Sequence, residues 1–133
     1  MIARTAIALG DEARAKSAYA RVKPIATGAI AAEALYYEAY FVHKDQLFER
    51  SNEVVQKLAS DYASYKEWGG KGLILMAKNY FELDDAFQAT YILESVINNF
   101  ESFPDIVTEA RNELDVIKAK EAQRNSSVPT DGN

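Results

Sequence analysis

The sequence has no cysteine, and it has only one histidine, six glycines and three prolines among its 133 residues. Without cysteine, neither a disulfide bond nor a thiolate metal site can form. The shortage of glycine and proline favours helices over a fold rich in loops. No run of about 18 apolar residues is present, so we predict no membrane-spanning helix. The N-terminus also lacks the basic and then apolar layout of a signal peptide.

The composition that remains is ordinary for a globular domain, with 48% hydrophobic and 26% charged residues. A chain of 133 residues has room for one domain. The net charge of −5 argues against a nucleic-acid-binding protein, which normally has a basic face. Residues 1–30 carry five basic and two acidic side chains, whereas residues 67–103 carry two basic and six acidic. This asymmetry either biases assembly and partner choice or is ordinary variation between solvated faces.

One pattern of small and bulky residues occurs twice, and the second copy lies 38 residues after the first. The first copy consists of Leu35, Tyr37, Ala39, Val42, Ser51, Val55, Leu58 and Tyr62. The second copy consists of Leu73, Leu75, Ala77, Tyr80, Ala89, Leu93, Val96 and Phe100. A repeat of this length predicts a solenoid of helical hairpins. Such a fold offers a continuous binding surface, which indicates a binding or scaffolding function without naming the partner.

Apolar residues recur at helical spacing in seven segments and predict seven helices. These span residues 2–9, 11–22, 29–43, 46–62, 71–82, 86–100 and 105–123. Asp11 and Asp45 are predicted to cap the helices that follow them. Asp84 and Asp85 form a turn whose aspartate caps the next helix, and a polar turn is predicted from Ser64 to Gly70.

These segments predict one all-α domain over residues 1–124, arranged as a superhelical solenoid of antiparallel helix hairpins. The domain divides into a partial repeat, two full repeats and a C-terminal capping helix, at residues 1–30, 32–66, 70–103 and 105–123. The last segment, residues 125–133, is small and polar and is predicted to be a disordered tail.

The first residues, Met1-Ile2-Ala3, fall directly into a helical pattern with no cap residue before them. We therefore expect the chain to begin inside a hairpin, as a piece of a longer protein would. This start exposes apolar surface at Ile2, Ile7 and Leu9, which predicts self-association through the N-terminal end.

The hairpins resemble tetratricopeptide repeats over about residues 1–103, with the last helix as a cap. The family's unit has a small and then an aromatic residue, a short turn, and again a small and then a bulky residue. The third pair of helices, in the repeat at residues 70–103, matches this pattern with Ala77, Tyr80, Asp84-Asp85, Ala89 and Leu93. The second pair, in the repeat at residues 32–66, departs from this pattern. Val42 stands where the family has an aromatic residue, and the turn between the two helices lacks glycine.

The third pair and the cap are also similar to large envelope-associated repeat proteins of Bacteroidetes-type bacteria. The similarity runs from Asn79-Tyr80-Phe81 through Phe100 to Glu109-Ala110-Arg111. It implies a bacterial protein of the periplasm or outer-membrane region that takes part in cell-envelope assembly.

In tetratricopeptide repeats the first helix of each pair lines a concave groove that binds a partner. The resemblance assigns to this groove Glu33, Tyr36, Tyr40, His43, Lys44, Lys71, Ile74, Lys78, Phe81 and Glu82, with Arg4 and Arg111 at its ends. Tyr36 and Tyr40 are four residues apart and should stack along one helix face. Aromatic and cationic groups together suit an extended or helical peptide with some acidic residues. The alternative is that the tyrosines pack against their neighbours and the lysines are solvated.

Other chemistry-bearing residues have structural explanations. His43 lacks the nucleophile, carboxylate or further ligands that catalysis or metal binding needs, and a place in a last helical turn explains it. The cluster of Glu82, Asp84 and Asp85 lacks the spacing of a calcium loop. Trp68 either staples the second pair to the third or anchors a partner.

We therefore predict a non-catalytic scaffold without a cofactor or a bound metal, whose partner is a protein or peptide. A rival from another class is a small helical enzyme or ligand carrier. It would use a cavity lined by Tyr36, Tyr37, Tyr40 and His43. A third possibility is a structural spacer whose groove is unused.

Overall fold

A computed structural model describes residues 2–127, and within that range it contains seven α-helices and no strands. The prediction of an all-α fold is confirmed. The helices are α1 (Ile2–Ala8), α2 (Glu12–Val22), α3 (Gly28–Lys44), α4 (Phe48–Asp61), α5 (Lys66–Glu82), α6 (Ala86–Asn99) and α7 (Pro104–Ser127). The first three residues of the predicted tail, 125–127, belong to α7, and its remaining residues, 128–133, lie outside the described range.

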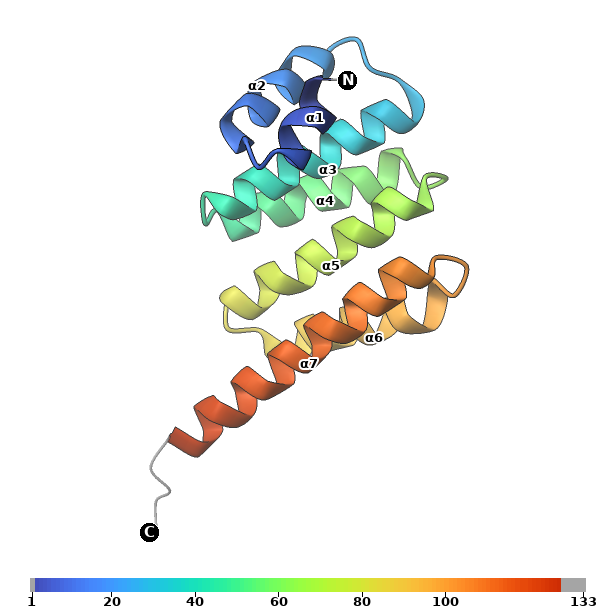
Figure 1. The fold of residues 1–133 in the computed structure, drawn as a ribbon. Helices are drawn as coiled ribbons and strands as arrows, with labels where there is room; N and C mark the ends of the chain where they lie inside the picture. The colour runs from blue at the N-terminus through green and yellow to red at the C-terminus, as the bar shows by residue number, and fades with distance from the viewer. Residues whose placement is uncertain (1, 128–133) are drawn as a thin grey trace.

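The helices stack in chain order, from α1 and α2 at one end to α6 and α7 at the other (Figure 1). Each helix packs against the next one in sequence, and α5 also packs against both α3 and α7. Three apolar clusters follow the same order: the first joins α1, α2 and α3, the second α3, α4 and α5, and the third α5, α6 and α7. Helices α3 and α5 therefore belong to two clusters each and connect the array.

Paired helices approach each other at the small residues of the repeat. Ala39 and Ser51 are fully buried between α3 and α4, and Ala77 and Ala89 are fully buried between α5 and α6. The Ser51 hydroxyl donates a hydrogen bond to the backbone oxygen of Ala39 at 2.8 Å, which places the two backbones in close contact. The small residues of the 38-residue repeat thus mark where helices meet.

The turn inside each hairpin has one recurring geometry. Gly10, Gln46 and Asp84 have positive φ angles of 75°, 64° and 64°. The residue after each donates its backbone N–H to a carbonyl five residues earlier; these bonds are Asp11 to Ala6 (2.8 Å), Leu47 to Val42 (3.1 Å) and Asp85 to Tyr80 (2.8 Å). This is the hydrogen bond with which a left-handed residue ends a helix.

Two of the predicted helix caps are confirmed. The carboxylates of Asp11 and Asp85 accept hydrogen bonds from the backbone N–H groups of Arg14 and Gln88, at 3.2 and 3.1 Å. The predicted Asp45 cap is wrong, because the left-handed Gln46 moves the N-cap position of α4 two residues onward, from Asp45 to Leu47, and the helix begins at Phe48. Asp45 instead ends α3 and lies 3.5 Å from the ammonium group of Lys16.

The predicted turn before α5 is also wrong in its extent, since α5 begins at Lys66 and includes Gly69 and Gly70. The glycines mark close packing here. A Cβ atom on Gly70 would lie 2.9 Å from the Phe100 ring, and one on Gly72 would lie 3.1 Å from Leu58. Helix α5 can pack closely against its neighbours on both sides because these positions have no side chain.

We predict that replacing Gln46 with glycine stabilises the protein by about 0.5–1 kcal/mol. The left-handed conformation strains a residue with a Cβ atom, whereas glycine adopts it freely. The free energy of unfolding from urea titrations measures the effect. The matched control is Gln56→Gly, at an exposed position inside α4, which should cost about 1 kcal/mol. Equal losses in both variants would contradict the assigned turn geometry.

The neighbouring glycines of α5 give a second prediction. Gly69→Ala should stabilise the protein by about 0.5–1 kcal/mol, because its Cβ atom meets nothing within 4 Å and alanine favours a helix. Gly70→Ala should destabilise it, because overpacking against Phe100 and Ile106 costs roughly 1–3 kcal/mol. Melting temperatures of the two variants should therefore move in opposite directions, and a shared direction would refute the packing described for α5.

Candidate functional site

Six aromatic side chains form one cluster between α2, α3 and α5. Tyr37 lies at its centre: its ring stacks on Tyr19, with centroids 4.7 Å apart, and meets the edges of Tyr36 and Tyr40 at 5.0 and 5.9 Å. Trp68 of α5 lies 5.7 Å from the Tyr36 ring. The sixth member is Phe41. We call this group the aromatic cluster.

The ring contacts show how three residues of the aromatic cluster pack. Trp68 joins α5 to α3, as the interpretation of this residue as a staple required. The rings of Tyr36 and Tyr40 each make an edge-to-face contact with the ring of Tyr37, so both side chains pack against a neighbouring aromatic residue. Both remain partly exposed at the edge of the cluster.

Burial keeps the phenols of this cluster protonated. It raises the pKa of Tyr36 above its ordinary value, and the charge of Glu109 on α7 adds to the shift. Burial also raises the pKa of Tyr40, to about 12, helped by the hydrogen bond that its hydroxyl donates to Glu12 at 2.7 Å. The tyrosines therefore offer neutral hydroxyl and ring surface at physiological pH, and none of them is poised as a base.

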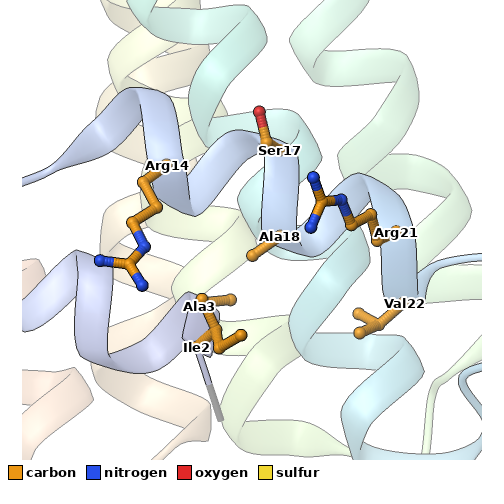
Figure 2. A pocket seen from close by; sticks show the side chains of 7 residues that line it. All are labelled: Ile2, Ala3, Arg14, Ser17, Ala18, Arg21 and Val22. Carbon is orange, nitrogen blue, oxygen red and sulfur yellow. The ribbon is translucent and has the colours of Figure 1, made fainter.

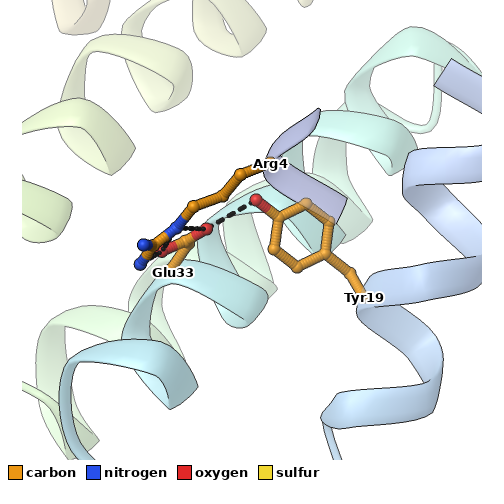
Figure 3. A network of polar contacts seen from close by, with 3 residues as sticks. All are labelled: Arg4, Tyr19 and Glu33. Carbon is orange, nitrogen blue, oxygen red and sulfur yellow. Dashed lines mark hydrogen bonds and ion pairs between the residues drawn. The ribbon is translucent and has the colours of Figure 1, made fainter. Parts of the chain in front are cut away.

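Glu33 is only 1% exposed. Figure 3 shows its carboxylate facing the Arg4 guanidinium and the Tyr19 hydroxyl. Its carboxylate accepts hydrogen bonds from the Arg4 guanidinium, the shortest at 2.5 Å, and from the Tyr19 hydroxyl at 2.6 Å. Burial alone would raise the pKa of Glu33, but the hydrogen bonds and the positive charge of Arg4 outweigh it and hold this pKa below its ordinary value. Glu33 and Arg4, both expected in a groove, together anchor α1 to α3.

Three of the predicted groove lysines lie beside aromatic or acidic groups. The Lys71 ammonium lies 4.8 Å from the Trp68 ring centre, and Lys44 lies 5.9 Å from that of Tyr40. Lys78 is 4.0 Å from Glu113 of α7, with 38% of its side chain exposed. These are cation–π and ion-pair distances that still leave the ammonium groups accessible to a partner.

The assignment of Ile74 and Phe81 to a groove needs correction, because the two side chains are only 2% and 8% exposed. Both belong to the apolar cluster formed with α6 and α7. Lys120 and Arg124 of α7 also lie over the Phe81 ring, at 5.7 and 5.4 Å. Helix α7 occupies the space in which Phe81 would meet a partner, whereas Glu82 and Arg111 are exposed.

His43 belongs to a buried polar network that the sequence analysis missed. The Asn79 amide donates to Ser51 at 2.8 Å and to Asn52 at 2.9 Å, so its oxygen is left to accept from His43 Nδ1 at 2.6 Å. Asn79 and Ser51 are fully buried. The network fixes α3, α4 and α5 together, which gives His43 a structural role. In the sequence, the only signal of this network is that polar residues occupy positions that the periodicity assigns to the core.

Two cavities are lined in part by residues of α2. One, of about 350 Å³, opens between α1 and α2 (Figure 2). Another, of about 400 Å³, is lined by residues of α2, α3 and α4 and includes Tyr19 and Phe41. Neither is lined by the four residues of the rival ligand-carrier hypothesis, which are Tyr36, Tyr37, Tyr40 and His43.

Over residues 2–127 no three histidine or carboxylate side chains gather where they could hold a metal ion. No helix in that range is both long and apolar enough to cross a membrane. Comparison of the chain with family models, with curated proteins and with solved structures finds no match. A function for this chain is therefore proposed from the arrangement of its own side chains.

We predict that Glu33→Gln lowers the free energy of unfolding by about 2 kcal/mol at neutral pH, through the loss of charge-assisted hydrogen bonds. Because the folded pKa of Glu33 lies below its ordinary value of 4.5, this contribution is present above that pH and is lost as the pH falls through the folded pKa. The difference between the two proteins should therefore shrink in acid.

Urea unfolding at a series of pH values measures this difference. Glu38→Gln is the matched control, because Glu38 pairs with the exposed ammonium of Lys23 on the surface and should matter by less than about 1 kcal/mol. A gap between wild type and Glu33→Gln that stays constant from neutral pH to well below 4.5 would show that the charge of Glu33 adds no stability.

Proposed function

We propose that this chain is a tetratricopeptide-like solenoid module that binds a protein or peptide and performs no chemistry of its own. The recurring turn at Gly10, Gln46 and Asp84 supports the repeat. The packing of α5 against both α3 and α7 supports a continuous face built from the first helices of the two full hairpins and the capping helix. A face of this kind is extended, which suits a long partner better than a small ligand.

The observation that carries the proposal is the position of Lys71, whose ammonium lies over Trp68 beside Tyr36. Trp68 and Tyr36 supply partly exposed ring surface, and Lys78 places a second cation two helical turns further along α5. Aromatic rings flanked by cations favour a peptide with an apolar anchor and acidic side chains.

Arg4, Lys44 and the aromatic cluster extend this surface onto α1 and α3. The resemblance to envelope-associated repeat proteins extends the proposal to a scaffold in bacterial cell-envelope assembly. In that setting the partner is another component of the assembly and carries an acidic segment.

Trp68 provides the assay, because it is the only tryptophan of the chain and lies at the proposed surface. We expect its fluorescence to change on titration with acidic peptides that carry one aromatic residue, and to stay unchanged with the same peptides after lysine replaces each acidic residue. The variant Lys71→Ala, Lys78→Ala should bind the acidic peptides about tenfold more weakly, a change of ~1.4 kcal/mol.

The control is Lys57→Ala, Lys118→Ala, which removes two exposed lysines from α4 and α7 and keeps the same net charge as the test variant. It should bind as wild type does. Equal weakening in both variants would reduce the effect to general electrostatic attraction. Trp68 fluorescence that stays unchanged with every acidic peptide would contradict the proposal that this surface binds them.

A further inference from the structure

The cavity between α1 and α2 has an apolar floor and a basic rim. Its floor is formed by Ile2, Ala3, Ala18 and Val22, and Arg14 and Arg21 stand on either side of Ala18 (Figure 2). Ile2 is 59% exposed, and both arginines are exposed. Neither guanidinium has an ion-pair partner among residues 2–127. We call this surface the basic cleft.

Helix α6 carries the opposite kind of surface near the other end of the array. Phe87 and Tyr91 are 79% and 65% exposed, and they lie one helical turn apart on the same side of α6. Glu94, which is exposed, continues the row. We call these three residues the aromatic ridge.

The repeat itself shows that the aromatic ridge is not needed for folding. One repeat earlier, the positions that correspond to Phe87 and Tyr91 hold Glu49 and Glu53, both exposed on α4. A solvated helix face accepts glutamate there, so two large exposed rings on α6 require another explanation. Exposed aromatic side chains that lie together on one face are typical of an interface.

The two surfaces match in spacing and in charge. Arg14, Ala18 and Arg21 follow one another at intervals of four and three residues, and so do Phe87, Tyr91 and Glu94. Each row is about 10 Å long at the rise of an α-helix. Small Ala18 leaves room for a ring between two arginines, which can stack on aromatic faces and pair with a glutamate.

We propose that the basic cleft of one copy binds the aromatic ridge of a second copy of this chain. The charge distribution favours this contact, since residues 1–30 are mainly basic and residues 67–103 mainly acidic. The contact joins two different surfaces, so each copy in a pair keeps one surface free. Association is therefore head-to-tail and open-ended, and chains longer than a dimer form as the concentration rises.

The test uses two variants of the full chain, each of which loses one surface. Arg14→Glu, Arg21→Glu removes the basic cleft, and Phe87→Ser, Tyr91→Ser removes the aromatic ridge. All four side chains are exposed, so both variants should retain the helical circular dichroism and cooperative melting of wild type. Analytical ultracentrifugation from micromolar to millimolar concentration measures the mass.

Wild type should exceed the mass of a dimer at the highest concentrations, and each variant alone should stay monomeric. An equal mixture of the two variants should form dimers that grow no further, because it contains one intact cleft and one intact ridge per pair. Raising the salt to about 1 M, where the Debye length falls to about 3 Å, should weaken the association.

The control variant Arg111→Glu, Lys118→Glu lies outside both surfaces and should associate as wild type does. A wild type that is monomeric throughout, or a mixture that stays monomeric while wild type associates, would overturn the proposal. Binding of acidic peptides at Trp68 is a separate readout, because neither variant alters the aromatic cluster. Failure of the head-to-tail contact is thereby distinguished from failure of the peptide-binding function.

Discussion

Close approach of helix backbones is the constraint on which the rest of the structure depends. The helices of the second and third hairpins touch where side chains are smallest, at Ala39 with Ser51 and at Ala77 with Ala89. The absence of a side chain at Gly70 lets α5 pack equally closely toward α6 and α7. Because protein interiors are tightly packed, one added methyl group at such a contact forces neighbouring side chains or backbone to shift. The positions of the aromatic cluster and of Lys71 follow from these contacts.

Two buried polar arrangements add specificity to this packing, each in a different part of the array. Glu33 fixes α1 and α2 on α3, and Asn79 fixes α5 on α3 and α4. A buried carboxylate or amide is costly unless every partner is in place, so each arrangement selects one register between its helices. Among the described residues the third apolar cluster, around Leu93, contains no such polar group, and it relies on the shape of its side chains.

Local information was sufficient to predict the helices but not the partners of individual side chains. Periodicity identified all seven segments, and Asp11 was predicted correctly because a cap acts within one helical turn. The turn assigned to Gly70 was wrong, since the reason for that glycine is Phe100, thirty residues away in sequence. The burial of Glu33 depends in the same way on Arg4 and Tyr19, so the candidate binding surface could be predicted only in part.

The order of contacts along the chain also bears on how this protein is made. Each helix packs mainly against helices that are one or two elements away in the sequence, so few contacts depend on distant segments of the chain. Proteins with such local contacts fold quickly, because little chain entropy is lost before the contacts form. Each hairpin can therefore pack onto the one before it as it leaves the ribosome, and α7 then covers the apolar surface of α5 and α6.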